Sequence, residues 1–398
     1  MVDTPWLTII GLGEDGPDGL SPASHQALRA AEIVMGPPRH LALLPDLSCE
    51  RVEWPVPFSD GLAMLDGFRG KTVVVLASGD PFWFGAGSVI ARRFARQEWR
   101  AFPGSSAFSL AATRLGWPLE RVATLGLHAA PLTRLRPHLC CGNRVLVLVR
   151  DGKAVSDLAD WITEAGFGAS TLHVMEALGG PRERVRSGLA CEPGPDSVIH
   201  PVCVGIELAG DGPPLPLSSG RPDEIFEHDG QITKRPIRAL TLSALAPVHG
   251  ERLWDIGGGS GSIAIEWLMS HPSLSAISIE PREDRAARIR RNATALGMDH
   301  LDVVCGTAPE ALTGLDQPDA VFVGGGLSDP LLEWISANLS GTRLVANAVT
   351  LESEAVLGRW QARLGGDLMR IDLAMAHPIG SRTGWKSSYP VVQWKVRL

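Results

Sequence analysis

Apolar residues along this chain gather in short continuous runs, separated by glycine-rich turns and by stretches with helical spacing. The run at residues 71–77 is apolar at nearly every position, which is typical of a parallel strand covered on both faces. Before residue 116 the pattern predicts strands at 7–10, 33–35 and 71–77, and helices at 23–31, 87–96 and 103–115, with a short segment at 100–102 between the last two helices. Each predicted strand runs into a loop at its carboxyl end, where the ligand sites of α/β sheets gather.

A second group of elements is predicted between residues 144 and 207. Its strands are expected at 144–149, 170–176 and 198–207, with a helix at 155–165. Residues 208–222 show no hydrophobic period and are rich in Gly, Pro and Ser, which is typical of a linker. We therefore predict an α/β domain at residues 1–210, a linker at 211–222 and a second domain at 223–398.

After the linker, strands and helices alternate regularly. Strands are predicted at 253–256, 276–280, 301–304, 319–323 and 343–347, and helices at 237–245, 262–269, 285–296 and 331–339. This order predicts one doubly wound sheet with right-handed crossovers.

Composition narrows the class of protein. The 398 residues carry a formal net charge of −7, which disfavours a broad surface for nucleic acid. No apolar run approaches the ~18 to 20 residues of a membrane span, and the first residues lack the pattern of a signal peptide. We therefore expect a cytoplasmic protein that binds neither nucleic acid nor membrane. The six cysteines contain no Cys-x-x-Cys pair, so we expect free, mostly buried thiols and no metal site.

A glycine turn follows the strand at 253–256 and opens the next helix. It reads Asp255-x-Gly257-x-Gly259-x-Gly261, with Gly258 and Ser260 between the spaced glycines. Glycines allow a positive φ and a close approach of ligand to backbone, and the N–H groups of the helix start point into the same space. A dinucleotide fold requires glycine at position 262, where this chain has Ser262. The turn instead resembles motif I of the class I S-adenosylmethionine (SAM) methyltransferases, in which Gly258 stands where alanine is expected and adds slack.

Three later strand ends extend this resemblance. Glu280 closes the strand after the turn, where an acid can accept hydrogen bonds from both ribose hydroxyls, although an acid at a strand end is otherwise a solvated residue. The resemblance implies that backbone around Ala308 contacts adenine. The loops at 323–326 and 347–350, the second of which begins at Asn347, would line the space for the methyl acceptor. Neither loop is Asn-Pro-Pro-aromatic, which disfavours methylation of a base nitrogen.

The loops of the first half resemble those of the tetrapyrrole methylases. The matching motifs are Gly11-Leu12-Gly13, Gly36-x-x-Arg39-His40, Ser78-Gly79-Asp80-Pro81 and Pro103-Gly104-Ser105-Ser106. The family folds as two α/β subdomains with SAM in the cleft between them. The resemblance implies cofactor contacts at Gly13, Gly79, Asp80, Pro81, Ser105 and Ser106. Asp80 has a second interpretation as a turn residue that binds its own backbone. Pro37 departs from the pattern, so Arg39 and His40 are either functional or a structural pair.

The second half also resembles the small decarboxylating methyltransferases of cobalamin synthesis, through Gly230, Ile232, Thr233 and Lys234. We take Thr233, Lys234, Asn347 and Arg382 as candidate catalytic residues. Arg382 lies in a predicted glycine-rich loop beside Trp385 and Lys386, suited to a flat, carboxylate-rich substrate; an exposed hairpin loop is the alternative. Five arginines lie close together between residues 282 and 291, and we expect most of them to be solvated.

The two resemblances together imply a fused enzyme of cobalamin synthesis. Its expected reaction is SAM-dependent methylation of precorrin-6B at carbons 5 and 15 with loss of an acetate carboxyl, giving precorrin-8X. We expect two SAM sites, no metal, a tetrapyrrole substrate and a homo-oligomer. The first domain would methylate carbon 5, and the second would methylate carbon 15 and decarboxylate. Two alternatives remain: another acceptor, such as a different tetrapyrrole or RNA, or a first half that only carries substrate.

Overall fold

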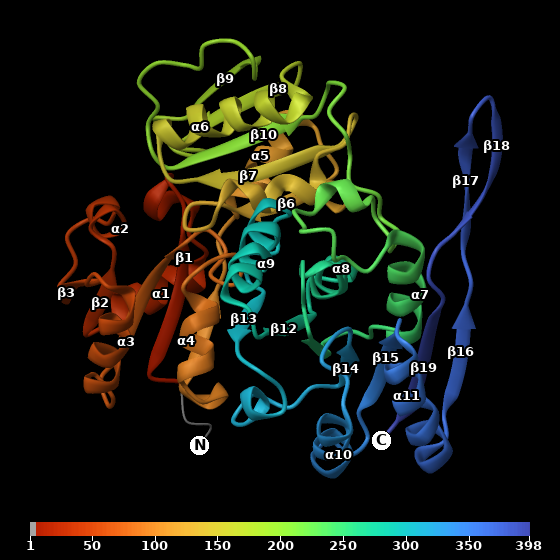
Figure 1. Ribbon diagram of the computed structural model, residues 1–398. Helices are drawn as coiled ribbons and strands as arrows, with labels where there is room; N and C mark the ends of the chain where they lie inside the picture. The colour runs from red at the N-terminus through yellow and green to blue at the C-terminus, as the bar shows by residue number, and fades with distance from the viewer. Residues whose placement is uncertain (1–4) are drawn as a thin grey trace. The chain divides into compact units, whose positions relative to one another are not determined.

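The computed structural model describes residues 5–398, which divide into two compact units. The first unit contains the residues up to Ala130 together with His138–Pro213, and the second contains Pro131–Pro137 and Pro214–Leu398. Both units are α/β, as predicted (Figure 1). The division between Pro213 and Pro214 lies within the range predicted as a linker.

The first sheet of the first unit is parallel, in the order β3-β2-β4-β1-β5. Its strands are β1 (Leu7–Leu12), β2 (Ile33–Gly36), β3 (Glu50–Glu53), β4 (Val73–Ser78) and β5 (Trp99–Phe102). Strands β1 and β2 are fully buried, as is β4 up to its last residue, which explains their continuous apolar sequence. Strand β3 was not predicted because it is a mostly exposed, charged edge strand.

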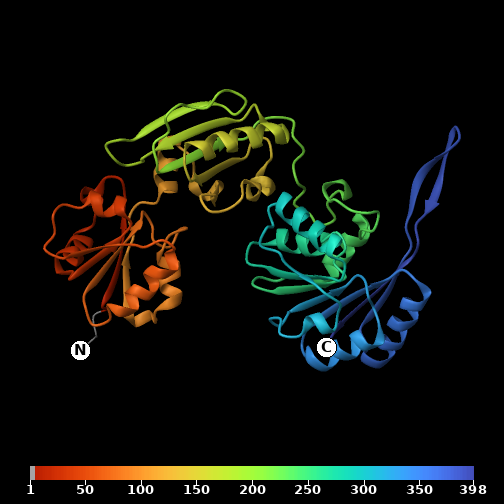
Figure 2. The ribbon, with the colours of Figure 1, turned by 60° about the vertical axis from the view of Figure 1, so that its left-hand side comes forward.

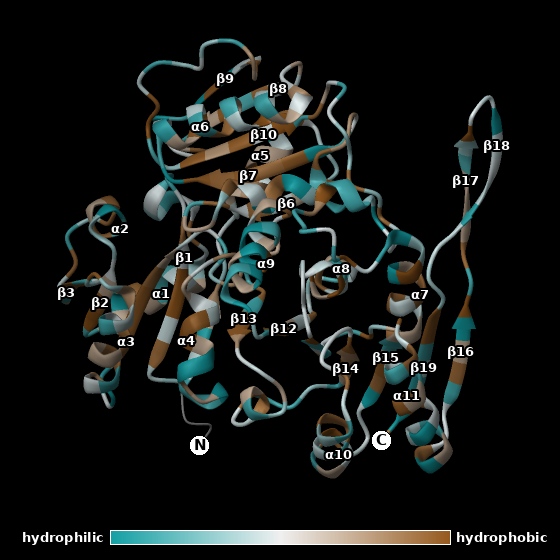
Figure 3. Ribbon diagram, viewed as in Figure 1, coloured by the Kyte–Doolittle hydropathy of each residue, from teal (hydrophilic) through white to brown (hydrophobic). Residues whose placement is uncertain are grey.

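The second sheet of the first unit is mixed, in the order β6-β7-β10-β8-β9, with β10 antiparallel to both of its neighbours. Its strands are β6 (Ala123–Gly126), β7 (Arg144–Val149), β8 (Thr171–Glu176), β9 (Arg184–Leu189) and β10 (Val202–Glu207). The helices of this unit are α1 (Pro22–Ala30), α2 (Pro38–Leu43), α3 (Phe58–Gly67), α4 (Gly87–Arg93), α5 (Ala107–Leu115) and α6 (Gly152–Ile162). The hydrophobic colouring of β7 and β10 contrasts with the mixed surface of α6 (Figure 3).

The second unit is built on one sheet in the order β13-β12-β11-β14-β15-β19-β16. Its strands are β11 (Arg252–Ile256), β12 (Ser275–Glu280), β13 (Asp302–Cys305), β14 (Ala320–Val323), β15 (Arg343–Ala348), β16 (Asp367–Ile371) and β19 (Val391–Arg397). The helices are α7 (Arg235–Leu245), α8 (Ser262–Ser270), α9 (Glu283–Ala295), α10 (Asp329–Asn338) and α11 (Leu351–Leu364). Strands β11 to β15 are parallel, as predicted, whereas β19 is antiparallel to β15 and to β16.

A hairpin extends from this unit, formed by β17 (Ala374–Ile379) and β18 (Arg382–Ser387) (Figure 2). The prediction of a glycine-rich loop at 382–386 was wrong, because these residues form strand β18. The turn is made at Gly380 and Ser381, since Ile379 pairs directly with Arg382 and Gly380 has a φ of +60°.

Two features of the whole described chain bear on composition. No helix within residues 5–398 has both the length and the apolar character that crossing a bilayer requires. All six cysteines lie in the described part and are free, as predicted. The expectation that most are buried was wrong: Cys203 is buried, and Cys141, Cys191 and Cys305 are exposed.

Candidate functional site

Three loops of the first unit meet through glycines. Gly11 lies near the end of β1, Gly79 directly follows β4, and Gly104 lies just beyond β5; these three strands are neighbours in the sheet. A Cβ on Gly11 would lie 1.7 Å from the carbonyl oxygen of Gly79, and the Gly104 N–H donates to that same oxygen at 3.0 Å. A side chain at Gly11 would therefore push the loops apart, so the glycine motifs of the sequence serve to bring these three strand ends together.

A cavity of about 730 Å³ lies beside these loops and is also lined by residues of the second sheet. Its volume is in the range of small-molecule sites, roughly 300–1,000 Å³. Five of the six residues predicted to contact cofactor in this unit line it: Gly13, Gly79, Asp80, Ser105 and Ser106. Pro81 is not among the lining residues; it is buried, and its carbonyl accepts the Gly87 N–H at 2.9 Å.

Asp80 has the turn geometry and lies at the cavity wall. Its Oδ1 accepts the backbone N–H of Phe82 at 2.8 Å, which is the turn geometry, and the residue also lines the cavity. Ser106 caps α5 by accepting the N–H of Ser109 at 3.0 Å. Both residues therefore shape the loops at the cavity wall, and Asp80 keeps acceptor capacity for a ligand.

Arg39 and His40 also line the cavity and are joined to one another. Arg39 pairs with the buried Glu14 and donates to Nε2 of His40 at 2.9 Å and to Ser78 Oγ at 3.3 Å. Glu14 also pairs with Arg182 at 3.1 Å. Burial, and then the charge of Arg39, lowers the pKa of His40 to about 4. The imidazole is therefore neutral near pH 7 and accepts at Nε2.

Other cavity residues were not predicted from the sequence. Trp83 and Phe84 are exposed aromatic residues directly after the Gly-Asp-Pro loop, and both rings contact Phe108. Arg150, directly after β7, and His200, just before β10, also line the cavity. Glu14 directly follows the first glycine motif, and Arg150 directly follows a buried strand. Their positions after strand ends could therefore have indicated from the sequence that they lie at the site.

The glycine turn of the second unit takes the conformation that its sequence requires. Gly257, Gly259 and Gly261 have φ angles of +75°, +61° and +77°. A Cβ on Gly257 would lie 2.6 Å from the backbone nitrogen of Gly325, so the turn packs against the glycine loop after β14. At Gly259 the nearest atom to such a Cβ is 3.9 Å away, so the turn has room there for a ligand.

The expectation that Gly258 adds slack was wrong. A Cβ at this position would lie 2.1 Å from Oγ of Ser278 and 2.9 Å from Cδ1 of Ile289. Ser278 is fully buried on β12, so its hydroxyl occupies the space that an alanine methyl would need. Gly258 and Ser278 therefore form a matched pair.

The two acids predicted at this site have different environments. Asp255 is buried, and its Oδ2 accepts the Ala264 N–H of α8 at 3.3 Å. Burial raises its pKa to about 7, and the nearby charge of Glu280 acts in the same direction. Glu280 is also buried, and its two oxygens accept the N–H groups of Gly259 at 2.9 Å and Arg282 at 3.1 Å. Each of these oxygens retains a lone pair that can accept a hydrogen bond from a hydroxyl group. Asp255 instead stabilises the turn through its hydrogen bond to the start of α8.

Thr233 and Lys234 immediately precede α7. The carbonyl of Thr233 accepts a hydrogen bond from the buried guanidinium of Arg238. Lys234 is exposed, with Nζ 3.8 Å from Oδ2 of Asp223. Its ammonium group is therefore available to an anionic ligand.

The remaining predicted residues lie on other elements of the sheet. Asn347 on β15 donates to Thr241 Oγ1 at 2.9 Å and accepts from Gln393 at 2.9 Å, so a buried polar network fixes its amide. Ala308 lies after β13 and packs beside a hydrophobic cluster. Arg382 is exposed at the end of the hairpin, and the structure does not bring it to the glycine turn.

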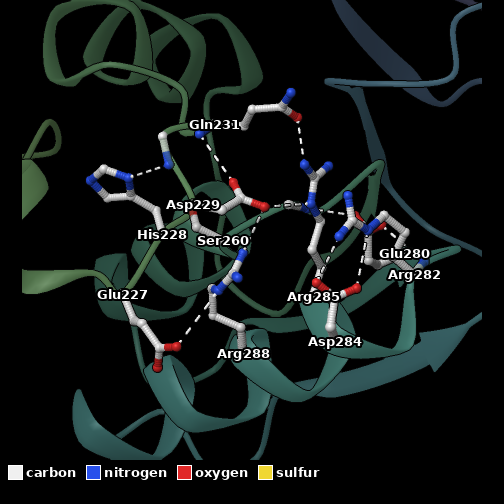
Figure 4. Close-up of polar contacts among 12 residues, drawn as sticks. Glu227, His228, Asp229, Gln231, Ser260, Glu280, Arg282, Asp284, Arg285 and Arg288 are labelled. Carbon is white, nitrogen blue, oxygen red and sulfur yellow. Dashed lines mark hydrogen bonds and ion pairs between the residues drawn. The ribbon is translucent and has the colours of Figure 1, made fainter.

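Most of the five arginines between residues 282 and 291 were predicted to be solvated; Arg282, Arg290 and Arg291 are, and two are not. The side chains of Arg285 and Arg288 are 15% and 13% exposed, and both contact Asp229 (Figure 4). The sequence showed the positive charges but not Asp229, which approaches from a distant segment of the chain.

These features suit SAM in general terms. The open space at Gly259, the buried carboxylate of Glu280 and the helix start at Ser262 match the needs of an adenosyl ligand. No cluster of His, Cys, Asp and Glu within residues 5–398 is arranged to hold a metal ion.

Comparison with known proteins agrees with this division of the chain. Residues 6–193 match the family described as "Tetrapyrrole (Corrin/Porphyrin) Methylases", and residues 224–398 match the "Precorrin methyltransferase domain". A precorrin-6Y C(5,15)-methyltransferase [decarboxylating] from Sinorhizobium sp is 53% identical over 98% of this chain and 96% of its own length. The protein of that name from Mycobacterium tuberculosis is 42% identical over 98% of this chain and 99% of its own.

A shorter relative matches part of the chain. The cobalt-precorrin-6B C(15)-methyltransferase (decarboxylating) of Salmonella typhimurium is 31% identical over 177 residues, which are 42% of this chain and 91% of that protein. Identity to the longer relatives extends over nearly their full length, through both units. The chain therefore belongs to the precorrin-6Y C5,15-methyltransferase (decarboxylating) family.

Proposed function

We propose that each unit of this chain holds one SAM, that the first unit methylates carbon 5 of precorrin-6B, and that the second methylates carbon 15 and removes the acetate carboxyl. SAM-dependent methylation with decarboxylation is the activity of the family to which the chain belongs. One observation supports two sites: the chain contains two separate sets of glycine loops at strand ends. One set includes Gly11, Gly79 and Gly104, and the other is the turn at 257–261.

In the first unit, the cavity would receive both cofactor and macrocycle. Bound SAM supplies a methyl group on a positively charged sulfur. The backbone of Gly79 and the carboxylate of Asp80 would orient it, and Trp83 and Phe84 offer flat apolar surfaces to the macrocycle. Alignment of the reacting atoms at roughly 3 to 3.5 Å lowers the barrier without a strong base, because the ring carbon is itself nucleophilic.

In the second unit, the glycine turn and Glu280 would bind the adenosyl group, with the carboxylate accepting from ribose hydroxyls. Lys234, whose ammonium group is exposed, would bind a carboxylate of the substrate. Asn347 stands on β15 at the expected acceptor side, with its amide orientation fixed by Thr241 and Gln393. Arg382 is proposed as a further contact to a substrate carboxylate.

Decarboxylation places a simple demand on the second site. When the bond between the acetate methylene and its carboxyl breaks, carbon dioxide leaves and the electron pair enters the conjugated macrocycle. A proton then returns to the carbon. The site must therefore hold the macrocycle in place and exclude competing reactions, and a cation such as Lys234 must not bind the departing carboxylate too tightly.

The division of labour is supported by the shorter relative. That protein is named for methylation at carbon 15 with decarboxylation, and its 177 matched residues are close in length to the second-domain match at residues 224–398. By subtraction, we assign carbon 5 to the first unit.

The test uses the full chain. Calorimetry should count two SAM molecules per chain, and NMR of the product made with ¹³C-methyl SAM and precorrin-6B should locate each new methyl. Glu280→Gln should abolish methylation at carbon 15 alone. The carboxylate accepts hydrogen bonds from the N–H groups of Gly259 and Arg282, and the NH2 group of a glutamine would face one of these donors without an acceptor between them. Asp80→Ala should abolish methylation at carbon 5 alone, and Asp18→Ala, which leaves the cavity unchanged, is the control.

Two results would contradict the proposal. One SAM per chain, with both methyl transfers unaffected by Asp80→Ala, would make the first unit a carrier for the macrocycle. Loss of the carbon-5 methyl in Glu280→Gln with carbon 15 intact would reverse the assignment of the units.

A further inference from the structure

A segment without regular secondary structure, residues 227–234, lies beside the glycine turn of the second unit (Figure 4). In the described structure, residues 228–233 form no backbone–backbone hydrogen bonds. Segments of this kind have little intrinsic order, because nothing in the main chain fixes their conformation. The position of the segment is therefore set by side chains.

Both ends of the segment are anchored. The side chain of Asn292 on α9 accepts the N–H of Glu227 at 2.8 Å and donates to the carbonyl of Glu227 at 2.9 Å. It also donates to the carbonyl of Ser260 at 2.8 Å, so the same buried amide binds the glycine turn. At the other end, Arg238 donates to the carbonyl of Thr233.

The middle of the segment is held by Arg285. Its Nε donates to Oδ2 of Asp229 at 2.9 Å, and its Nη2 donates to Oε1 of Gln231 at 2.7 Å. Arg288 adds a second contact to Asp229 Oδ2 at 3.1 Å. Figure 4 shows the dashed contacts that join Asp229 and Gln231 to Arg285, and Asp229 to Arg288.

Residues 229–231, which Arg285 holds, face the open side of the glycine turn at Gly259. The carbonyl oxygen of Gln231 is 4.0 Å from the position that a Cβ on Gly259 would occupy. The Gly259 N–H is in turn bound by Glu280 at 2.9 Å. Gln231 therefore borders the space in which the proposed SAM site lies, although its own side chain points to Arg285.

We propose that Arg285 is a positioning residue for SAM in the second unit, because its bridge between Asp229 and Gln231 holds residues 229–231 over the glycine turn. The inference rests on the proposed SAM site at Gly257–Gly261. A guanidinium suits this role because Nε and Nη2 serve two acceptors in fixed directions, which a lysine ammonium cannot reproduce. Without the bridge, the segment must become ordered when SAM binds. The free energy of that ordering is then subtracted from the binding free energy, so the affinity for SAM falls.

The test compares Arg285→Gln with Arg290→Gln in the full chain. Both substitutions remove one positive charge from α9, but Arg290 contacts Glu283 and the carbonyl of Val303 and not the segment. Calorimetry should show about tenfold weaker SAM binding at one of two sites in Arg285→Gln, equivalent to about 1.4 kcal/mol, and unchanged binding in Arg290→Gln. The KM for SAM in carbon-15 methylation should rise similarly, with kcat at saturating SAM little changed.

Two further variants separate positioning from simple stability. Gln231→Ala keeps every charge and the Asp229 ion pair but removes one arm of the bridge, so it should also weaken SAM binding. Gln231→Glu keeps an acceptor for Arg285 and should bind SAM as the unaltered chain does. Arg285→Lys should not restore full affinity.

Each outcome decides between the claims. Unchanged SAM affinity in Arg285→Gln, or in Gln231→Ala if Arg285→Gln fails to fold, would overturn the positioning role while leaving the SAM site intact. Failure of the unaltered chain to bind SAM in a manner sensitive to Glu280→Gln would overturn the proposed function itself.

Discussion

Arg238 donates from Nε to Oε1 of Glu266 at 2.7 Å, and both side chains are fully buried. Glu266 also accepts the N–H groups of Gly220 at 2.7 Å and Arg221 at 2.9 Å. This carboxylate on α8 therefore fixes the end of the linker and, through Arg238, the segment that leads to Thr233. Each partner satisfies the charge of the other in an interior that water does not reach.

Substitution of Glu266 by Gln should destabilise the second unit strongly. The amide removes the fully buried counter-charge of Arg238 and leaves it the partly exposed Asp223 at 3.0 Å. Breaking a buried pair costs about 3–5 kcal/mol, and the remaining pair places the expected loss at the lower end of that range. Denaturant unfolding, followed by tryptophan fluorescence to which the buried Trp267 and Trp254 of this unit contribute, measures the change. The variant Glu352→Gln, at an exposed position of α11, is the control and should alter stability by less than about 0.5 kcal/mol. A loss at Glu266 no larger than that of the control would show that the pair is dispensable.

Gly258→Ala should also destabilise the second unit, and Ser278→Ala should partly reverse the effect. The added methyl meets Oγ of Ser278 at 2.1 Å, and removal of that oxygen leaves the flexible end of Ile289 as the nearest obstacle. Overpacking of this kind typically costs about 1–3 kcal/mol. A double-mutant cycle by thermal unfolding should therefore be non-additive. Strict additivity would mean that the serine hydroxyl is not what excludes alanine.

The glycine motifs were readable from sequence because their constraint is local. Gly257, Gly259 and Gly261 have positive φ angles, and the residue type alone indicates that conformation. The buried parallel strands were likewise found from continuous apolar runs. In the first unit, five predicted cofactor residues line one cavity because loops at neighbouring strand ends necessarily meet.

Contacts made across long sequence separations were not readable. The arginines of α9 gave no sign that Asp229, 56 residues before Arg285, would bind them. The close approach of Ser278 to Gly258 likewise depends on the pairing of β11 and β12. The strand at Arg382 was predicted as a loop because its polar, glycine-containing sequence is compatible with a loop and with an exposed strand. Only its pairing with β17 decides between these two structures.

His40 should remain neutral throughout the physiological range. Burial and the charge of Arg39 lower its pKa to about 4, so its NMR signals should not titrate between pH 5 and 8. Arg39→Gln removes the second of these causes and should raise the pKa towards the ordinary value of about 6.5. An unchanged titration in the Arg39 variant would show that burial alone sets this pKa.

The stability of the second unit should fall as the pH rises from about 4 to about 7, through Asp255. Its folded pKa of about 7 lies above the ordinary aspartate value of 3.8, so between these values the folded chain holds a proton that the unfolded chain has released. The stabilisation is complete below the unfolded pKa and is lost as the pH passes the folded pKa; by linkage it amounts to at most about 4 kcal/mol. Asp255→Asn, which is neutral throughout, should flatten this slope in unfolding curves measured from pH 4 to 8. An equal slope in both proteins would mean that the buried carboxyl is ionised well below pH 7.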